Sequence, residues 1–206
     1  MNNIKRSLTF LLILIFISCD LKESKVKVFK PDASIGKDAA ISEGNEKANF
    51  STLDRIHMLS LSSNDSVKND VRSLLRFGFT TLKEGIKIDS AFIFLQAIEP
   101  GHFGKKNSFT LLPVESLWIN SEVNWKNQPS VDENNTIILE APKEALQDYR
   151  INVTELISAI YRNEKPNYGF MLKLENEKNS YKGLRFHSSD SRELDKHPRL
   201  EVFYHE

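Results

Sequence analysis

Short segments in which apolar and polar side chains alternate recur along this chain, and they constrain its fold more than any other feature. The clearest is segment 91–97, whose odd-numbered residues form a smooth aliphatic face while Phe92, Phe94 and Gln96 point the opposite way. A period of two residues is that of a strand with one face buried. The chain is therefore expected to fold mainly into β-sheets.

Other strands are expected where alternation, or a run of β-branched and aromatic residues, meets turn residues. The expected strands are 25–30, 38–41, 56–61, 71–79, 88–97, 108–114, 123–125, 136–139, 168–174, 183–187 and 199–204. A helical spacing of apolar residues occurs over 153–162, between the capping-box pair Asn152 and Glu155 and the helix breaker Pro166. Many short strands with one short helix indicate an all-β fold, an antiparallel β-sandwich of jelly-roll type that the helix caps at one end.

Segment 117–129 holds both tryptophans of the protein, Trp118 and Trp125, beside Asn, Ser and Pro. Such a segment is either a corner of the core or a platform for a ligand. The core interpretation is favoured because indole rings are highly buried on average. We therefore expect Trp118 or Trp125 in the core, and we keep Trp118 as a candidate ligand residue as well.

The N-terminus combines a basic start, an apolar run and the protein's one cysteine. Lys5 and Arg6 precede an apolar run over 8–17, which is short for a membrane span and has the proportions of a signal-peptide core. The segment that ends at Cys19 resembles a bacterial lipobox, whose cysteine becomes the lipidated first residue of the mature protein, although Phe16 stands where leucine is usual. The alternative is a plain secretory signal with an incidental cysteine.

These features predict three parts: a lipoprotein signal peptide at 1–18, a lipid-anchored tether at 19–25 and a β-sandwich domain at 26–206. Acyl chains attached to Cys19 would hold the protein to a membrane by burying methylene groups, each contributing about 0.8 kcal/mol. The expected location is the bacterial cell envelope, at the outer membrane or the cell surface.

Charge and cysteine content exclude several classes of function. Lys plus Arg and Asp plus Glu both number 28, so the formal net charge is zero and no basic block favours a nucleic-acid partner. With Cys19 as its one cysteine, the chain has no internal disulfide and no cysteine-based zinc site. The 5 histidines show no metal-binding spacing, so no metal or cofactor is expected, but a structural calcium ion held by loop carbonyls would leave no sequence signature.

Several segments, taken in their order and spacing, resemble the DNRLRE-domain family. They are 38–42 with 44–45 and 49–50, 74–77, 88–91, Trp118 with 123–129, 151–154, 167–170, 186–193 and 198–202. The resemblance spans about residues 26–204, and Asn152 departs from the aspartate usual at its position. It implies a non-catalytic β-sandwich of the kind attached to secreted polysaccharide-degrading enzymes or bacterial surface proteins. Some of these modules are similar to carbohydrate-binding modules that recognise uronate-rich, alginate-like polysaccharides.

A module that binds acidic sugars needs aromatic planes for the sugar rings and cations for the carboxylates. The candidate ligand-binding residues are Arg76, Lys173, Phe92, Phe94 and Trp118. All of these except Trp118, together with Phe203, lie opposite the core side of their expected strands, so they are expected to share one outer face. A second small core beneath the helix or an N-terminal segment is the other interpretation, and it is favoured more for the phenylalanines than for Arg76 and Lys173.

Three functions of different classes remain open. The first is a non-catalytic envelope module that binds acidic, uronate-rich polysaccharide, and the second is a structural or adhesive surface protein that contacts other envelope proteins. The third, a polysaccharide lyase, is the least favoured because no convergent acid–base set is visible. Arg55-Ile56-His57 and Tyr181-Lys182-Gly183 only faintly resemble the segments usual in sandwich-fold alginate lyases.

Overall fold

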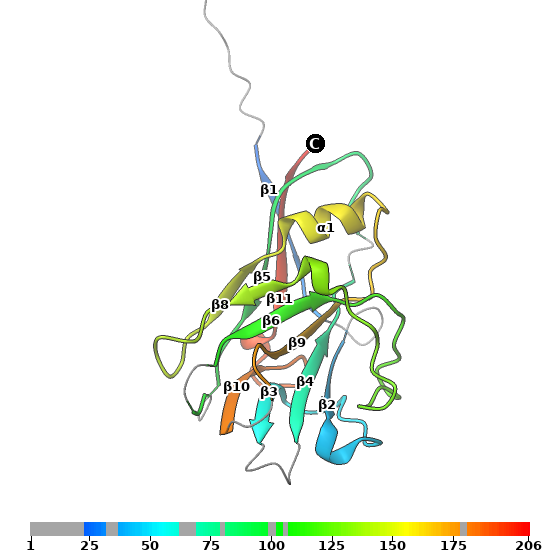
Figure 1. Ribbon diagram of the computed structural model, residues 1–206. Helices are drawn as coiled ribbons and strands as arrows, with labels where there is room; N and C mark the ends of the chain where they lie inside the picture. The colour runs from blue at the N-terminus through cyan, green and yellow to red at the C-terminus, as the bar shows by residue number, and fades with distance from the viewer. Residues whose placement is uncertain are drawn as a thin grey trace, which may run out of the picture.

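The computed structural model describes residues 23–31, 37–61, 69–78, 81–98, 102–104, 107–177 and 181–206. Two antiparallel β-sheets pack face to face, and one short helix lies at the end where β1 begins and β11 finishes (Figure 1). The expectation of an all-β sandwich is confirmed. The predicted signal peptide at 1–18 and the predicted lipidation site Cys19 lie outside the described residues.

The bounds of the elements agree with most of the expected strands. The strands are β1 Lys25–Phe29, β2 Asp38–Ser42, β3 Arg55–Leu61, β4 Asp70–Leu75, β5 Lys87–Leu95, β6 Phe109–Pro113, β7 Ile137–Leu139, β8 Tyr149–Asn152, β9 Phe170–Leu174, β10 Tyr181–His187 and β11 Arg199–His205. The helix α1 spans Thr154–Tyr161, and single 3-10 turns lie at Glu43–Asn45, Glu133–Asn135 and Leu194–Lys196.

One sheet has the order β1-β11-β5-β8, and the other has the order β10-β3-β4-β9-β6-β7 with β2 also paired to β4. The first and last strands are neighbours, with Lys25 opposite Tyr204. Most neighbouring strands are not consecutive in the chain, which is the connectivity of Greek-key and jelly-roll sandwiches. The pairing of β1 with β11 is therefore a contact between segments that are far apart in the chain.

The main core lies between the two sheets and follows the two-residue period of the strands. In β5, Ala91, Ile93 and Leu95 are fully buried, whereas the residues between them face outward. Leu156 and Ile157 of α1 join the same core, so the helix closes one end of the sandwich as its amphipathic spacing predicts.

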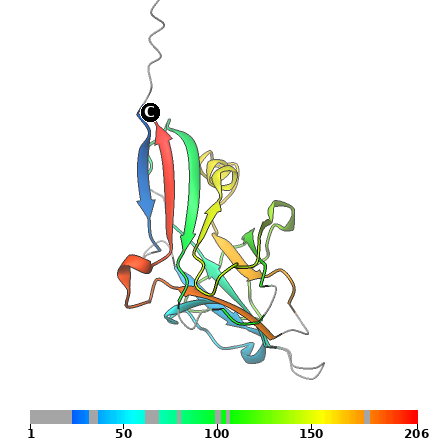
Figure 2. The same ribbon diagram turned by 90° about the vertical axis from the view of Figure 1, so that its left-hand side faces the viewer.

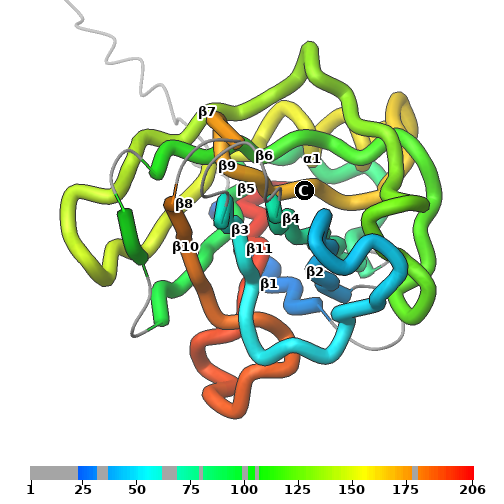
Figure 3. The backbone as a smooth tube through the Cα atoms, turned by 60° about the horizontal axis from the view of Figure 1, so that its bottom comes forward, coloured from blue at the N-terminus to red at the C-terminus, as the bar shows by residue number. Residues whose placement is uncertain are grey.

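A second, smaller cluster covers the outer side of the seven-stranded sheet. Segment 115–131 crosses this side next to β2 (Figure 3), and Trp118 packs there against Leu74 and Met171. The Trp118 indole is only 6% exposed, and its Nε1–H donates a 2.8 Å hydrogen bond to the carbonyl of Tyr168. The expectation that a tryptophan of this segment is buried in the core is confirmed.

The structure corrects three local expectations. Residues 123–125 form no strand, because the backbone N–H of Asn124 is bound by the side chain of Asn127 in a turn. The strand β8 was not expected at all, since four residues are too few to show a reliable period. The predicted capping box of Asn152 and Glu155 is also not formed: the N-cap residue of α1 is Val153, which makes no side-chain cap hydrogen bond, and the carboxamide oxygen of Asn152 accepts instead from the N–H and the hydroxyl of Thr154.

A buried carboxylate ties the loop after β10 to β2. Asp38 is 4% exposed, and its Oδ2 accepts a 2.7 Å hydrogen bond from the backbone N–H of Ser189. Burial raises the pKa of Asp38 from 3.8 to about 6; Asp190 adds to the rise, while Ser189 and Lys37 oppose it. The carboxylate therefore stays charged at neutral pH only against a cost in folding free energy.

The burial of Trp118 leads to a stability prediction. We expect Trp118→Ala to lower the free energy of unfolding by about 3–5 kcal/mol, because it empties a buried site and leaves the Tyr168 carbonyl without its donor. Trp125→Ala is the matched comparison and should cost less, since the Trp125 ring is only partly buried. Urea denaturation measures both. An equal or larger loss for Trp125 would show that Trp118 is not the anchor of segment 115–131.

The second prediction concerns pH. Because folding raises the pKa of Asp38, the contribution of this group to stability is full below pH 3.8 and is lost as the pH rises through 6. Asp38→Asn keeps an oxygen that accepts from Ser189 and removes the titration. Between about pH 4 and about pH 7.5 the wild type should lose up to about 3 kcal/mol of unfolding free energy relative to the variant. Denaturation curves at several pH values test this, and a constant difference would contradict it.

Candidate functional site

The outer side of the four-stranded sheet gathers aromatic and cationic side chains. Phe94 of β5 lies directly across from Arg150 of β8 on one side and Arg199 of β11 on the other. Phe203 lies across from Ser90, which is two residues from Phe92 on β5, so Phe92 and Phe203 are on the same face. Figure 2 shows β1, β11 and β5 side by side in blue, red and green. We call Phe92, Phe94, Phe203, Arg150 and Arg199 the arginine–phenylalanine face.

Both guanidinium groups of this face lie over phenylalanine rings. The Cζ atom of Arg150 is 3.2 Å from the ring centre of Phe92 and 5.8 Å from that of Phe94. The Cζ atom of Arg199 is 4.1 Å from the ring centre of Phe94, and its Nε donates to Glu201 at 2.8 Å. Cation–π contact of this kind orients a guanidinium without occupying its N–H donors.

The face extends with apolar residues to the edge strand β1. The rings of Phe92 and Phe203 meet edge to face with their centres 6.3 Å apart. Val26 lies across from Phe203 and Val28 across from Glu201, and these valines are 52% and 47% exposed. The described outer side of this sheet is therefore an open surface with apolar, aromatic and cationic parts.

The expectation that all the candidate residues on strands share one outer face is wrong. Phe92, Phe94 and Phe203 are on the four-stranded sheet, whereas Arg76 follows β4 and Lys173 lies in β9 of the other sheet. A sandwich has two outward sides, and alternation along a strand does not say to which side a strand belongs.

Arg76 and Lys173 are also separated from each other. Met171 lies across from Leu74, and the two strands are antiparallel, so Arg76 and Lys173 each lie two residues from this pair in opposite directions. The two cations are therefore four residues, about 13 Å, apart along the strands. The Trp118 cluster fills the space between them, and the Cζ atom of Arg76 lies 5.6 Å from the Trp118 ring centre. Buried Trp118 presents no open plane for a sugar.

Gly169 marks how tightly the chain is packed beside Arg76. Its φ is +85°, and a Cβ atom there would lie 2.4 Å from the carbonyl oxygen of Leu75 and 2.8 Å from the Cβ atom of Arg76. Both the positive φ and the lack of space therefore exclude a side chain at this position.

Arg72, on the same side of β4, already makes two hydrogen bonds to Glu177 and one to Gln128.

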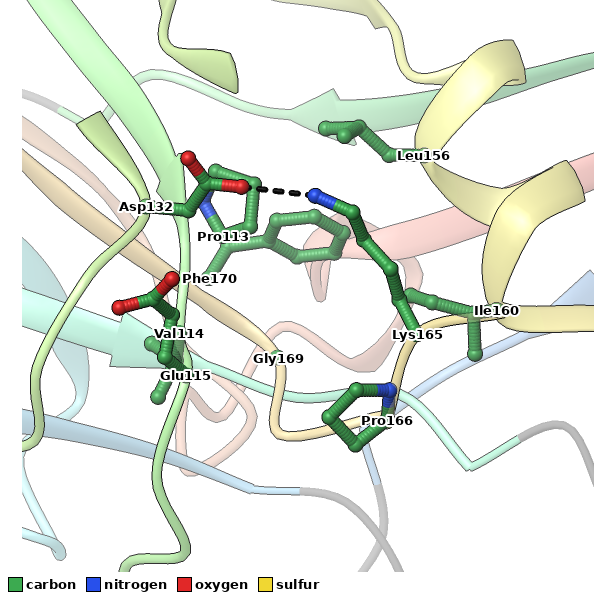
Figure 4. A pocket seen from close by; sticks show the side chains of 10 residues that line it. All are labelled: Pro113, Val114, Glu115, Asp132, Leu156, Ile160, Lys165, Pro166, Gly169 and Phe170. Carbon is green, nitrogen blue, oxygen red and sulfur yellow. Dashed lines mark hydrogen bonds and ion pairs between the residues drawn. The ribbon is translucent and has the colours of Figure 1, made fainter. Parts of the chain in front are cut away.

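A pocket of about 230 Å³ lies between α1 and the ends of β6 and β9 (Figure 4). Its wall is largely apolar, with Leu156 and Ile160 of the helix on one side. At its mouth Lys165 and Asp132 form a 2.7 Å ion pair, which lowers the pKa of Asp132, and the carboxylate of Glu115 is nearby. Two carboxylates and one paired ammonium make this pocket unsuitable for an acidic sugar.

The two segments with a faint likeness to alginate lyases lie on adjacent strands, β3 and β10. His57 is directly across from Arg185, whereas Tyr181 is across from Leu61. Four residues of strand, about 13 Å, therefore separate Tyr181 from the His57–Arg185 pair. A general acid and base that act on the same sugar must both lie within hydrogen-bond reach of it, and this arrangement does not provide that.

The described residues contain no group of three or more His, Cys, Asp or Glu that could hold a metal ion. Within the same part of the chain, no helix has the length and apolar character needed to cross a membrane.

The sequence analysis missed Arg150 and Arg199 as site residues. Arg150 lies in β8, where Tyr149 and Ile151 are buried and Arg150 is exposed, and an alternation over four residues is too short to be a reliable signal in the sequence. Arg199 was placed in its strand correctly, but only the pairing of β11 with β5 brings it against Phe94. Both arginines can be recognised as candidate site residues only from their cross-strand neighbours, which are distant in sequence.

Comparison with known proteins addresses the ligand class. No curated protein matches the chain. A model of carbohydrate-binding module family 96 matches residues 31–204. Carbohydrate-binding modules are typically non-catalytic, and this agrees with the expected class of function. The match begins just after β1 and ends within β11, so it covers nearly the whole described fold, and the chain therefore belongs to carbohydrate-binding module family 96.

Proposed function

We propose that this module binds an acidic, uronate-rich polysaccharide on the arginine–phenylalanine face. The observation that carries the proposal is the position of Arg150, which is exposed and stacked on Phe92. Arg150 forms no ion pair within the described part of the chain. An exposed guanidinium supported by an aromatic ring keeps its planar pair of donors available for a carboxylate.

The spacing of the cations fits a repeating anionic chain. Arg199, Phe94 and Arg150 form one row across three neighbouring strands. Two inter-strand spacings put the backbones of the arginines about 10 Å apart, with an aromatic ring between them. A sugar ring over Phe94 would have a guanidinium on each side, that of Arg150 without an ion pair in the described part of the chain and that of Arg199 with its Nε already donating to Glu201. The remaining N–H groups of both favour a polysaccharide with a carboxylate on successive units.

A structural or adhesive role is the second candidate, and the exposed valines of β1 support it. Val26 and Val28 continue the apolar surface of Phe203 to the sheet edge. Apolar residues grouped at an edge strand are typical of surfaces that contact other proteins. The two roles differ in ligand, so binding experiments separate them.

Replacement of Arg150 tests the polysaccharide site. Arg150→Gln should weaken binding to polyuronate by about 10-fold or more, because charge-assisted hydrogen bonds are lost while the strand pairing stays intact. Arg162→Gln is the matched control, since Arg162 is an exposed arginine after α1 that pairs with Glu164. Calorimetric titration of residues 20–206 with polyuronate and a neutral glucan, at low and high salt, measures the effect.

Each other outcome excludes part of this proposal. Equal affinity of wild type and Arg150→Gln would remove the arginine–phenylalanine face as the site. Equal binding of the neutral glucan would contradict selectivity for acidic sugars, and absence of glycan binding would favour the structural role. New ultraviolet absorbance from unsaturated uronate ends would show lyase activity.

We also propose that the protein is a lipoprotein of the cell envelope, anchored through Cys19. The support is the order of basic start, apolar run and single cysteine in the sequence. The described fold agrees with a tether of a few residues, because β1 begins at Lys25. The module would then be held at a membrane surface, where a polysaccharide-binding face has a use.

Fatty-acid labelling of cells tests the anchor. Wild-type protein should incorporate the labelled acyl chain and sediment with membranes, and Cys19→Ala should do neither, because the acceptor thiol is absent. Ser18→Ala is a neighbouring control that leaves the thiol in place. Equal labelling and sedimentation of Cys19→Ala would exclude this cysteine as the anchor.

A further inference from the structure

A second group of cations lies on the other sheet, on the outward side of the paired strands β3 and β10. Arg185 is directly across from His57, and Arg55 lies two residues before His57 on the same face. Cross-strand partners and residues two apart on one strand have Cβ atoms within about 7 Å of each other. We call Arg55, His57 and Arg185 the β3–β10 cation site.

The pKa of His57 reflects both its burial and the two arginines beside it. Burial is the largest cause that lowers the pKa of His57 from 6.5 to about 4, and Arg185 and then Arg55 contribute the rest of the decrease. Asp54 opposes them but has a smaller effect than either arginine. At neutral pH the imidazole is therefore uncharged and lies in a positive potential, which is a suitable environment for an oxyanion.

Two polar atoms of this site have no internal hydrogen bond. Arg55 Nε and His57 Nδ1 are buried from solvent and have no hydrogen-bond partner among the described residues. Asp54 Oδ1 lies 3.5 Å from Arg55 Nε, close enough for an ion pair but without hydrogen-bond geometry. Buried polar atoms in folded proteins are nearly always bonded, so these two atoms mark a place where internal hydrogen bonding is incomplete. An external carboxylate would meet the site at the other guanidinium N–H groups of Arg55, whose side chain is 34% exposed.

Aromatic rings continue the surface along β10. Phe103 exchanges two backbone hydrogen bonds with Gly183, and its ring lies over this glycine, where a Cβ atom would be 2.2 Å from Phe103 Cε1. The Cζ atom of Arg185 is 5.1 Å from the Phe103 ring centre, and the 67% exposed ring of Tyr181 is 4.9 Å from it on centres. A cation and two aromatic rings thus follow one another over about 13 Å of strand.

We propose that the β3–β10 cation site binds a carboxylate of a second acidic polysaccharide chain, whose adjoining sugars lie against Phe103 and Tyr181. This inference rests on the proposed function, because it takes the same class of ligand. The two sites are on the outward sides of opposite sheets, so one oligosaccharide does not reach both across the sandwich. One protein molecule then holds two chains and cross-links the polysaccharide.

Calorimetric stoichiometry with an alginate hexasaccharide tests the second site. The wild type should bind about two oligosaccharides per protein, and both Arg150→Gln and the double variant Arg55→Gln/Arg185→Gln should bind about one. Arg192→Gln, an exposed arginine in the loop after β10, is the matched control and should bind as the wild type does. Only proteins with both sites should raise the turbidity of long-chain alginate.

Thermal unfolding confirms that each variant is folded, and Arg55→Gln alone replaces the double variant if that one is not. A wild-type stoichiometry of about one that Arg150→Gln abolishes would overturn the second site and leave the proposed function intact. A single event lost only on replacement of Arg55 or Arg185 would support the β3–β10 cation site and contradict the arginine–phenylalanine face. Absence of any binding would overturn both.

Discussion

Burial of one side of β5 against the opposite sheet determines what its other side presents. Ala91, Ile93 and Leu95 are enclosed in the core, so the strand period leaves Phe92 and Phe94 outside. Large aromatic rings on an open sheet are a liability for solubility unless something covers them or uses them. Arg150 covers Phe92 from the neighbouring strand, and a single cross-strand contact thus serves both the surface and the site.

The outer side of the seven-stranded sheet is partly covered by another segment of the chain, whereas that of the four-stranded sheet is open, and this difference limits where a ligand can lie. Segment 115–131 covers β2, β4 and β9 with a second cluster around Trp118. Arg72 helps to hold that segment, because it bonds to Gln128 and its Cζ atom is 4.6 Å from the Trp125 ring centre. Among the described residues, the outer sides of the four-stranded sheet and of β3 and β10 lie outside this cluster.

The arginines that lie beside aromatic rings differ in whether their guanidinium groups are already bonded within the protein. Arg72 is bonded to both oxygens of Glu177, so its guanidinium is already satisfied within the protein. Arg150 has the same aromatic support without an ion pair in the described part of the chain, which leaves donors for an external carboxylate. Family membership establishes the class of ligand, but only this kind of local comparison indicates a face, since folds carry sites and do not define them.

The sequence by itself determined the fold class, most strand positions, the helix and the outward direction of Phe92, Phe94, Arg76 and Lys173. These properties depend on periods of two and 3.6 residues, which are local and visible in any short window. The burial of a tryptophan in segment 117–129 was predictable for a similar reason, since it follows from the size of the side chain.

Only the tertiary structure decided which outward residues lie together. Strand alternation separates core from exterior within one strand, but a sandwich has two exteriors, and the assignment of β5 and β9 to different sheets puts Phe94 and Lys173 on opposite sides. Arg150 and Arg199 became neighbours of Phe94 through pairing between segments about 50 and 100 residues away in the chain. Sheet pairing is a long-range interaction that no local period encodes, and for that reason the site could not be assembled from the sequence.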